Sequence, residues 1–145
     1  MELDNNIYQL KITYLIDGKP KPYRVLEIEK HQSLTQLAEA ILGSFNWDCN
    51  HCFGFYNNIT NWTNSTIKYE EFVDLEDMEY FVSKNAKSPN KSTIKNAFKK
   101  TPTLLFLFDY GTEHLFKVKL VKQVDLVSSV KYPKIVESFG KLKKQ

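Results

Sequence analysis

The chain has 145 residues, enough for one domain with a normal hydrophobic core that needs no metal or disulfide for support. Its 42% hydrophobic and 26% charged residues and its mean hydropathy of −0.41 are those of a soluble protein, and no apolar run approaches the roughly 18 residues of a membrane span. The N-terminus has no signal-peptide pattern, so we expect a cytoplasmic protein, and the net charge of +3 permits nucleic-acid contact without arguing for it.

The N-terminal third predicts a long β-hairpin followed by a helix. Residues 7–16 and 23–30 alternate apolar and polar side chains with a period of two, and the turn-forming DGKPKP segment separates them. Ser33 then opens a helix with Gln36 as its capping-box partner, and apolar residues continue at helical spacing as far as Phe45. The apolar stripe of this helix must pack on a sheet.

The middle of the chain predicts a third strand, a loop and a second helical segment. After Trp47, CFGFYNN has the pattern of a strand, and an Asn- and Thr-rich loop follows it as far as Ser65. Residues 68–82 place apolar side chains roughly on one helical face among many carboxylates, so we expect a short helix there. The linker-like SKNAKSPNKS comes next, and residues 93–100 favour one helical turn.

The C-terminal third predicts two strands joined by a tight turn, and then a basic tail. Residues 104–119, LLFLFDYGTEHLFKVK, are two apolar strand patterns around Gly111, and we expect this glycine to take a positive φ. Residues 128–145 form the tail. The resulting order of elements is that of a single α+β domain over residues 1–145. We expect a mainly antiparallel sheet with one main helix packed on one face, as in an α/β roll or a β-grasp-like arrangement.

The order of several aromatic blocks carries a family resemblance. The blocks are Tyr8-x-Leu10-x-Ile12-x-Tyr14, Pro22-Tyr23-Arg24, Trp47 with His51, Cys52 and Phe55, then Tyr56 and Trp62, and finally Phe106-x-Phe108-Asp109-Tyr110-Gly111 with Phe116. Over residues 7–124 this pattern resembles the Ri-plasmid open-reading-frame-three-like family, whose small domains occur on plasmids, in insertion elements and in bacterial chromosomes. The resemblance implies a domain associated with mobile elements and without an established activity.

The chain departs from the family pattern at three places. Thr112 stands where the family usually has a second Asp, and His114 stands where it usually has Trp. The acidic, Pro-rich and Cys-containing motif that usually ends the family is missing, and only Tyr132 and Pro133 match it. The first two departures lie at the turn that also carries candidate site residues.

The two cysteines suggest two hypotheses, a metal centre and a redox-active thiol. Cys49, His51 and Cys52 lie within four residues, and S and N donors are the ligands of zinc, with His114 as a fourth donor. A single C-x-x-C lacks its second pair, and neighbouring residues of a strand point to opposite faces. A reactive thiolate is favoured at a helix N-terminus, whereas this pair follows a helix C-terminus. We therefore predict no metal and no other cofactor, and Cys52 as a small buried hydrophobe.

A general acid–base site is a third reading. Asp48, His51, Asp109, Glu113 and His114 supply carboxylates and imidazoles, but the sequence distinguishes no nucleophile and has no phosphate-binding Gly-rich loop. The alternative is that the residues from Asp109 onward only satisfy the geometry of a hairpin turn. We therefore predict no catalytic residue.

The sequence favours a binding or protein-interaction module over an enzyme. The candidate binding residues, from the two signature segments and the loop between them, are Trp47, His51, Phe55, Trp62, Asp109, Tyr110, Glu113 and His114. The alternative for the rings of Trp47 and Phe55 is the core itself. A protein partner is the first expectation and a membrane is not expected. A nucleic-acid-associated accessory protein is the second reading because of the lysines, and a hydrolase-like enzyme is the third. The site exists only if the two signature segments are neighbours in space.

Overall fold

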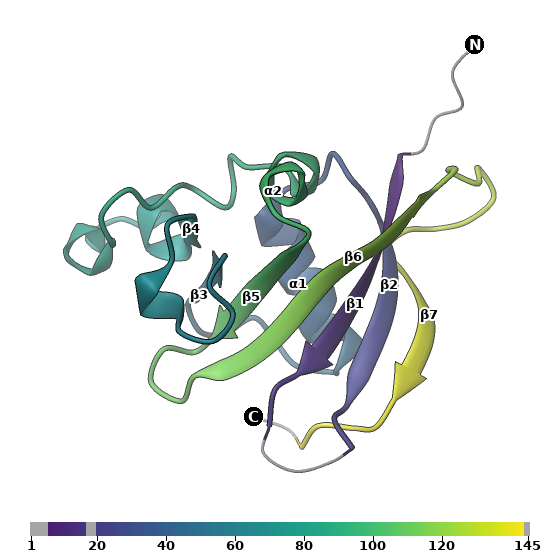
Figure 1. Ribbon diagram of the computed structural model, residues 1–145, viewed down its shortest axis with the longest axis horizontal. Helices are drawn as coiled ribbons and strands as arrows, with labels where there is room; N and C mark the ends of the chain where they lie inside the picture. Colours follow the sequence, from purple (N-terminus) through teal and green to yellow (C-terminus); the bar gives the residue numbers. More distant parts are fainter. Residues whose placement is uncertain (1–5, 17–19, 144–145) are drawn as a thin grey trace.

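An antiparallel sheet of seven strands organises the chain in the computed structural model, which describes residues 6–16 and 20–143. The strands are β1 (Ile7–Tyr14), β2 (Tyr23–Glu29), β3 (Phe53–Tyr56), β4 (Lys68–Glu70), β5 (Thr103–Phe108), β6 (His114–Val124) and β7 (Lys134–Phe139). Their order across the sheet is β4-β3-β5-β6-β1-β2-β7 (Figure 1). The N-terminal strand β1 therefore lies inside the sheet, between β2 and the late strand β6.

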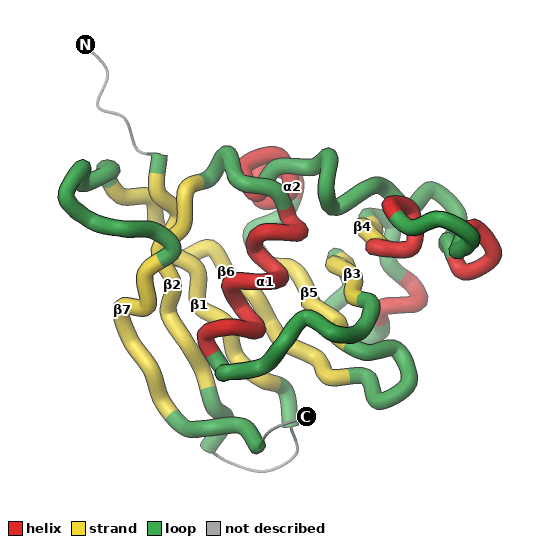
Figure 2. Tube along the Cα trace, turned by 180° about the vertical axis from the view of Figure 1, so that it is seen from behind, coloured by secondary structure: helices red, strands yellow, loops and turns green. Residues whose placement is uncertain are grey.

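The helix α1 (Leu34–Ser44) covers one face of this sheet, as Figure 2 shows from behind. Its first turn has the expected capping box, because the Ser33 hydroxyl accepts from Gln36 N and the Gln36 side chain accepts from Ser33 N. A second helix, α2 (Ile94–Lys100), begins after Thr93, whose hydroxyl accepts from Asn96 N.

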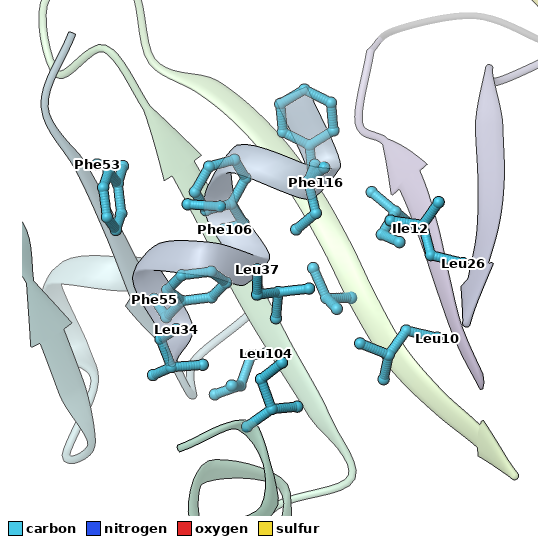
Figure 3. Packing of buried hydrophobic residues seen from close by; sticks show 14 of the residues in the cluster. Leu10, Ile12, Leu26, Leu34, Leu37, Phe53, Phe55, Leu104, Phe106 and Phe116 are labelled. Atoms are coloured by element: carbon cyan, nitrogen blue, oxygen red, sulfur yellow. The ribbon is translucent and has the colours of Figure 1, made fainter. Parts of the chain in front are cut away.

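The main core lies between α1 and the sheet. Alternation along β1 turns Tyr8, Leu10 and Ile12 toward the helix, and buried leucines of α1 meet them. Phenylalanine rings fill the part of the core under β3, β5 and β6 (Figure 3), namely those of Phe53, Phe55, Phe106 and Phe116. Burial of these rings is the main stabilising contribution to the fold.

The opposite face of the sheet is half covered. Under the loop of residues 57–66 lies a small second cluster built on Tyr56, Leu105 and Leu107. The rest of this face is polar, and the alternation of β1 and β6 turns Lys11, Lys117 and Lys119 outward there. Lys11 and Lys119 are direct cross-strand neighbours.

The expected helix over residues 68–82 is wrong. The segment begins as strand β4 and continues as two 3₁₀ turns, Glu71–Asp74 and Glu79–Phe81. Carboxylates three and four residues apart repel one another on a helix, and Lys68, at the start of the segment, is the one Lys or Arg set against six of them. Glu70 is also buried in the sheet, and Asp77 takes a φ of 61° that ends a helix.

The basic tail over residues 128–145 is likewise corrected, because it contains β7. This strand pairs with β2 and forms the edge of the sheet, with every residue exposed and an irregular register between Val25 and Leu26. After β7, Leu142 packs against the main core, and the carbonyl of Lys143 accepts from Trp47 Nε1 at 2.8 Å.

The expectation of a mainly antiparallel sheet combined with helix is confirmed. The expectation of one main helix is not, because α2 also contributes Ile94, Ala97 and Phe98 to the core. The α/β roll or β-grasp-like arrangement stays a prediction. Within the described part of the chain, no helix has the length and apolar character to cross a membrane.

Candidate functional site

The two signature segments lie side by side. Strands β3 and β5 are paired with Phe53 opposite Phe108, and just beyond them Asp109 N donates to the carbonyl of Cys52 at 2.9 Å. The residues that precede β3 and those that follow β5 therefore meet at one corner of the sheet. His51 and the Asp109 turn come together there.

The turn between β5 and β6 holds Asp109 in a fixed orientation. Asp109 Oδ1 accepts from Gly111 N at 3.1 Å and from Thr112 N at 3.4 Å, and Glu113 N donates to the Asp109 carbonyl. The expected positive φ at Gly111 is wrong: Asp109 with 67° and Glu113 with 57° take the left-handed conformation instead. Asp adopts this region more readily than most residues, because its short side chain bonds to the backbone nearby.

A cleft of about 260 Å³ opens beside this turn. Its lining combines the signature segments with the segment after β4, and consists of His51, Cys52, Phe72, Met78, Phe81, Asp109 and Tyr110. The rings of Phe72 and Tyr110 lie 4.8 Å apart, and those of Phe72 and Phe81 lie 5.6 Å apart. Phe81 remains 60% exposed. The cleft is thus an apolar, aromatic cavity with one carboxylate and one imidazole.

His51 and Asp109 form the polar part of the cleft. His51 Nε2 lies 3.8 Å from Asp109 Oδ2, and the two side chains are 50% and 20% exposed. Desolvation alone would raise the pKa of Asp109, but hydrogen bonds from Thr112 and Gly111, together with His51, lower it below its ordinary value. Asp109 is therefore an anion at neutral pH.

A buried carboxylate fixes the outer wall of the cleft. Glu70, which is 1% exposed, accepts from Tyr56 Oη at 2.6 Å, from Ser83 N at 2.8 Å and from Ser83 Oγ at 2.7 Å. Because Ser83 follows Phe81, these bonds close both ends of the segment that carries the wall. The Tyr56 hydroxyl also bonds to the Tyr110 hydroxyl at 2.7 Å, so the same group positions one ring of the cleft.

The titratable groups around the cleft are poorly suited to nucleophilic chemistry. Burial raises the pKa of Cys52, and the neighbouring Glu71 carboxylate raises it further. Desolvation, followed by the Coulombic effects of Glu71 and Glu39, raises the pKa of Cys49 to about 11. Burial also raises the pKa of Tyr110 well above its ordinary value. A nucleophile beside the His51–Asp109 pair would need the opposite shift.

The same arrangement bears on metal binding. Among residues 6–16 and 20–143, no group of three or more His, Cys, Asp and Glu side chains is placed to hold a metal ion. His51 and His114 each contact the Phe108 ring, and His114 Nδ1 bonds to Tyr14 Oη at 2.9 Å. The ring nitrogen of His114 that faces Tyr14 is therefore already engaged.

The remaining predicted binding residues lie outside the cleft. Phe55 is fully buried in the core, and Trp47 is 7% exposed and packs on His114 at 4.6 Å. Trp62 covers the second cluster on the other face of the sheet, where its Nε1 donates to Glu113 at 3.3 Å. Of the eight candidates, the structure brings His51, Asp109 and Tyr110 together in one cavity.

Sequence reasoning missed the wall formed by Phe72, Met78 and Phe81, as well as the place of Cys52 in the lining. The signal in the sequence was a group of large apolar side chains within an acidic segment that has no core of its own to bury them. The spacing of these apolar residues was interpreted as the face of a helix that packs on the sheet, and not as the wall of a cleft.

Two larger cavities lie elsewhere on the molecule. One of about 460 Å³ is lined by Ile59 and polar residues of the 57–66 loop, but Asn57 Oδ1 accepts from Thr66 N and Ile67 N, and Asn58 Oδ1 accepts from Thr60 N and Asn61 N. These amides hold the loop itself. The other, of about 330 Å³, lies beside the C-terminal segment, and its lining includes Tyr14 and two of the predicted binding residues, Trp47 and His114.

Comparisons with known proteins bear on family and fold. A family model described as plasmid pRiA4b ORF-3-like protein matches residues 6–143. A solved structure of a protein of unknown function from Methanosarcina mazei Go1 superimposes with a TM-score of 0.75 at 19% identity, covering 96% of this chain and 72% of that one. At this identity the likeness shows the fold alone. No curated protein matches the chain.

Proposed function

We propose that this chain, which belongs to the plasmid pRiA4b ORF-3-like family as its sequence pattern predicted, is a binding module that takes a segment of a partner protein into the cleft beside Asp109. The observation that carries the proposal is an aromatic cavity that stays open at the surface. Membership of the family supplies no activity, so the proposal rests on the chemistry of the cavity.

The lining has the composition of a protein-docking pocket. Aromatic rings and methionine supply large contact areas, and they are the usual anchors of such interfaces. Phe81 is 60% exposed and the adjacent Tyr80 is 96% exposed, which is a large apolar area to leave in water. The bonds of Glu70 hold this wall in place, so little ordering is required on binding.

A random-peptide display library, selected on the immobilised protein, tests the proposal. We expect enriched peptides whose addition shifts the NMR signals of His51, Phe72 and Tyr110. Phe81→Ser should weaken their binding by roughly tenfold, about 1.4 kcal/mol, because it removes an anchoring ring that contributes little to folding. Val127→Ser, at another exposed apolar residue, is the matched control. Peptides that bind Phe81→Ser and the unmodified protein equally would contradict the proposal.

A second candidate function, nucleic-acid contact, is favoured by the open face of the sheet. Lys11 and Lys119 face each other there with Lys117 beside them, and like charges directly opposite are unfavourable unless an anion neutralises them. We expect any binding of short single-stranded DNA or RNA to fall steeply with salt and to weaken in a Lys117→Gln, Lys119→Gln variant. A gel-shift assay at low salt that detects no complex would eliminate this candidate.

A further inference from the structure

We infer that the partner segment is basic: a Lys or Arg side chain lies against Asp109 while a neighbouring apolar side chain enters the aromatic part of the cleft. This inference rests on the proposed function and names the chemistry of its partner. It follows from the Asp109 carboxylate, the aromatic rings of the lining and the distribution of charge around the cleft.

The carboxylate of Asp109, which lines the cleft, has room for one more hydrogen bond. The amides of Gly111 and Thr112 donate to Oδ1, the Thr112 side chain also bonds to the carboxylate, and His51 Nε2 lies 3.8 Å from Oδ2, beyond the length of a hydrogen bond. An ionised carboxylate accepts about four hydrogen bonds, so beside these three it can accept one from an ammonium or guanidinium group. Bonds of that kind are roughly twice as strong as neutral ones.

The rings of the lining favour the same ligand. Phe72, Phe81 and Tyr110 line the cavity together with Asp109. A cation within about 6 Å of an aromatic face is attracted to the ring, more strongly where water is excluded. The rings also contact the aliphatic stem of Lys or Arg and a neighbouring apolar side chain. A small cation alone would leave much of this apolar lining exposed.

The charge around the cleft complements a basic segment. The whole chain carries a net charge of +3, yet residues 69–83 contain six carboxylates and no Lys or Arg. Glu70 is buried among them, and most of the others are exposed beside the wall of the cleft. An acidic segment would be repelled from this wall, so the local charge selects against it.

The charge of Asp109 is testable without disturbing the turn. Asp109→Asn keeps an oxygen that accepts from Gly111 and Thr112, and Asn tolerates the positive φ of this position, so only the charge is removed. Asp125→Asn is the matched control, because Asp125 is exposed just beyond the opposite end of β6.

The peptide library is selected in parallel on the unmodified protein, Asp109→Asn and Asp125→Asn. On the unmodified protein and Asp125→Asn we expect cleft-binding peptides with Lys or Arg near an aromatic or aliphatic residue. On Asp109→Asn the basic residue should no longer be enriched. Replacing Lys by norleucine in an enriched peptide should weaken binding to the unmodified protein roughly tenfold in fluorescence anisotropy. The same replacement should have little effect on Asp109→Asn.

The outcomes separate this inference from the proposed function. Cleft-binding peptides without basic residues, still weakened by Phe81→Ser, would overturn the inference and leave the proposed function standing. A basic preference that persists in Asp109→Asn would overturn the role of the carboxylate. Equal binding of free lysine methyl ester and the peptide would show that a small cation suffices and would overturn the partner segment. Absence of any cleft-binding peptide would overturn both.

Discussion

Gly54 leaves the space in which the hydroxyls of Tyr56 and Tyr110 meet. A β-carbon at this position would overlap the Tyr110 hydroxyl and would lie 2.7 Å from Tyr56 Cε2 and 2.9 Å from Tyr56 Oη. Gly54→Ala should therefore destabilise the fold by about 1–3 kcal/mol in urea unfolding, as overpacked cores do. Gly43→Ala is the control, because nothing lies within 4 Å of its β-carbon, and it should gain about 0.4–1 kcal/mol. Equal effects of the two substitutions would mean that the hydroxyls move aside at little cost.

His114 should make the stability of the protein depend on pH. Burial lowers its pKa, Asp109 partly opposes this shift, and His51 adds to it. The unfolded chain binds the proton of this imidazole more readily than the folded chain does. The contribution of neutral His114 to the free energy of unfolding is therefore fully present above the ordinary pKa of about 6.5, and it is lost as the pH falls below that value. In urea unfolding at pH 7 and pH 5, the unmodified protein should lose more stability than His114→Gln, which can still bond to Tyr14. Identical losses would contradict the assignment.

Among the elements, the open face of the sheet carries a like-charge pair that a single substitution converts into an ion pair. Lys119→Glu places a carboxylate opposite Lys11 and should stabilise the fold by roughly 0.2–1 kcal/mol, less at high salt. Lys122→Glu, opposite the uncharged Gln9, serves as the control and should change little. Urea unfolding at two salt concentrations measures both. The prediction fails if Lys119→Glu is no more stable than Lys122→Glu.

The periodicity of apolar residues predicted the strands and the helix that bury one face. It failed after β4, where burial and charge repulsion determine the structure. The alternation before Tyr14 and the stripe of α1 required no knowledge of distant residues, because each has one apolar side to bury. The segment after β4 also has apolar residues at helical spacing. The burial of Glu70 and the repulsion of its neighbouring carboxylates outweigh that spacing, and neither is visible in periodicity alone.

At the scale of the whole molecule, strand order was beyond the sequence patterns. Strand β1 pairs along its length with β6, more than 100 residues later, and β7 joins the sheet from a segment whose lysines indicated a tail. The candidate site was predictable in part. His51 and Asp109 were identified because their segments carry the family pattern, whereas the third wall of the cleft comes from the segment whose structure was predicted wrongly.

The C-terminal segment, from β7 to Lys143, accepts hydrogen bonds from two residues of the N-terminal half, so its removal should destabilise the fold. Arg24, a buried residue, donates to the carbonyls of Phe139 and Gly140, and Trp47 Nε1 donates to Lys143 O. Truncation after Val130 removes these acceptors, although Arg24 keeps its bonds to the carbonyls of Ser44 and Tyr23. Together with the loss of β7, it should lower the free energy of unfolding by more than about 2 kcal/mol.

Tryptophan fluorescence follows that truncation at a single ring. In a Trp62→Phe background, Trp47 is the one remaining tryptophan, and the full-length Trp62→Phe protein is the control. We expect truncation to shift the Trp47 emission to longer wavelength, since the ring loses its cover and is wetted. Leu142→Ala, which keeps β7 and trims the packing against the core, should cause a smaller shift in the same direction even if the truncated chain fails to fold. An unchanged emission maximum in both variants would mean that the residues after β7 do not shield Trp47 in solution.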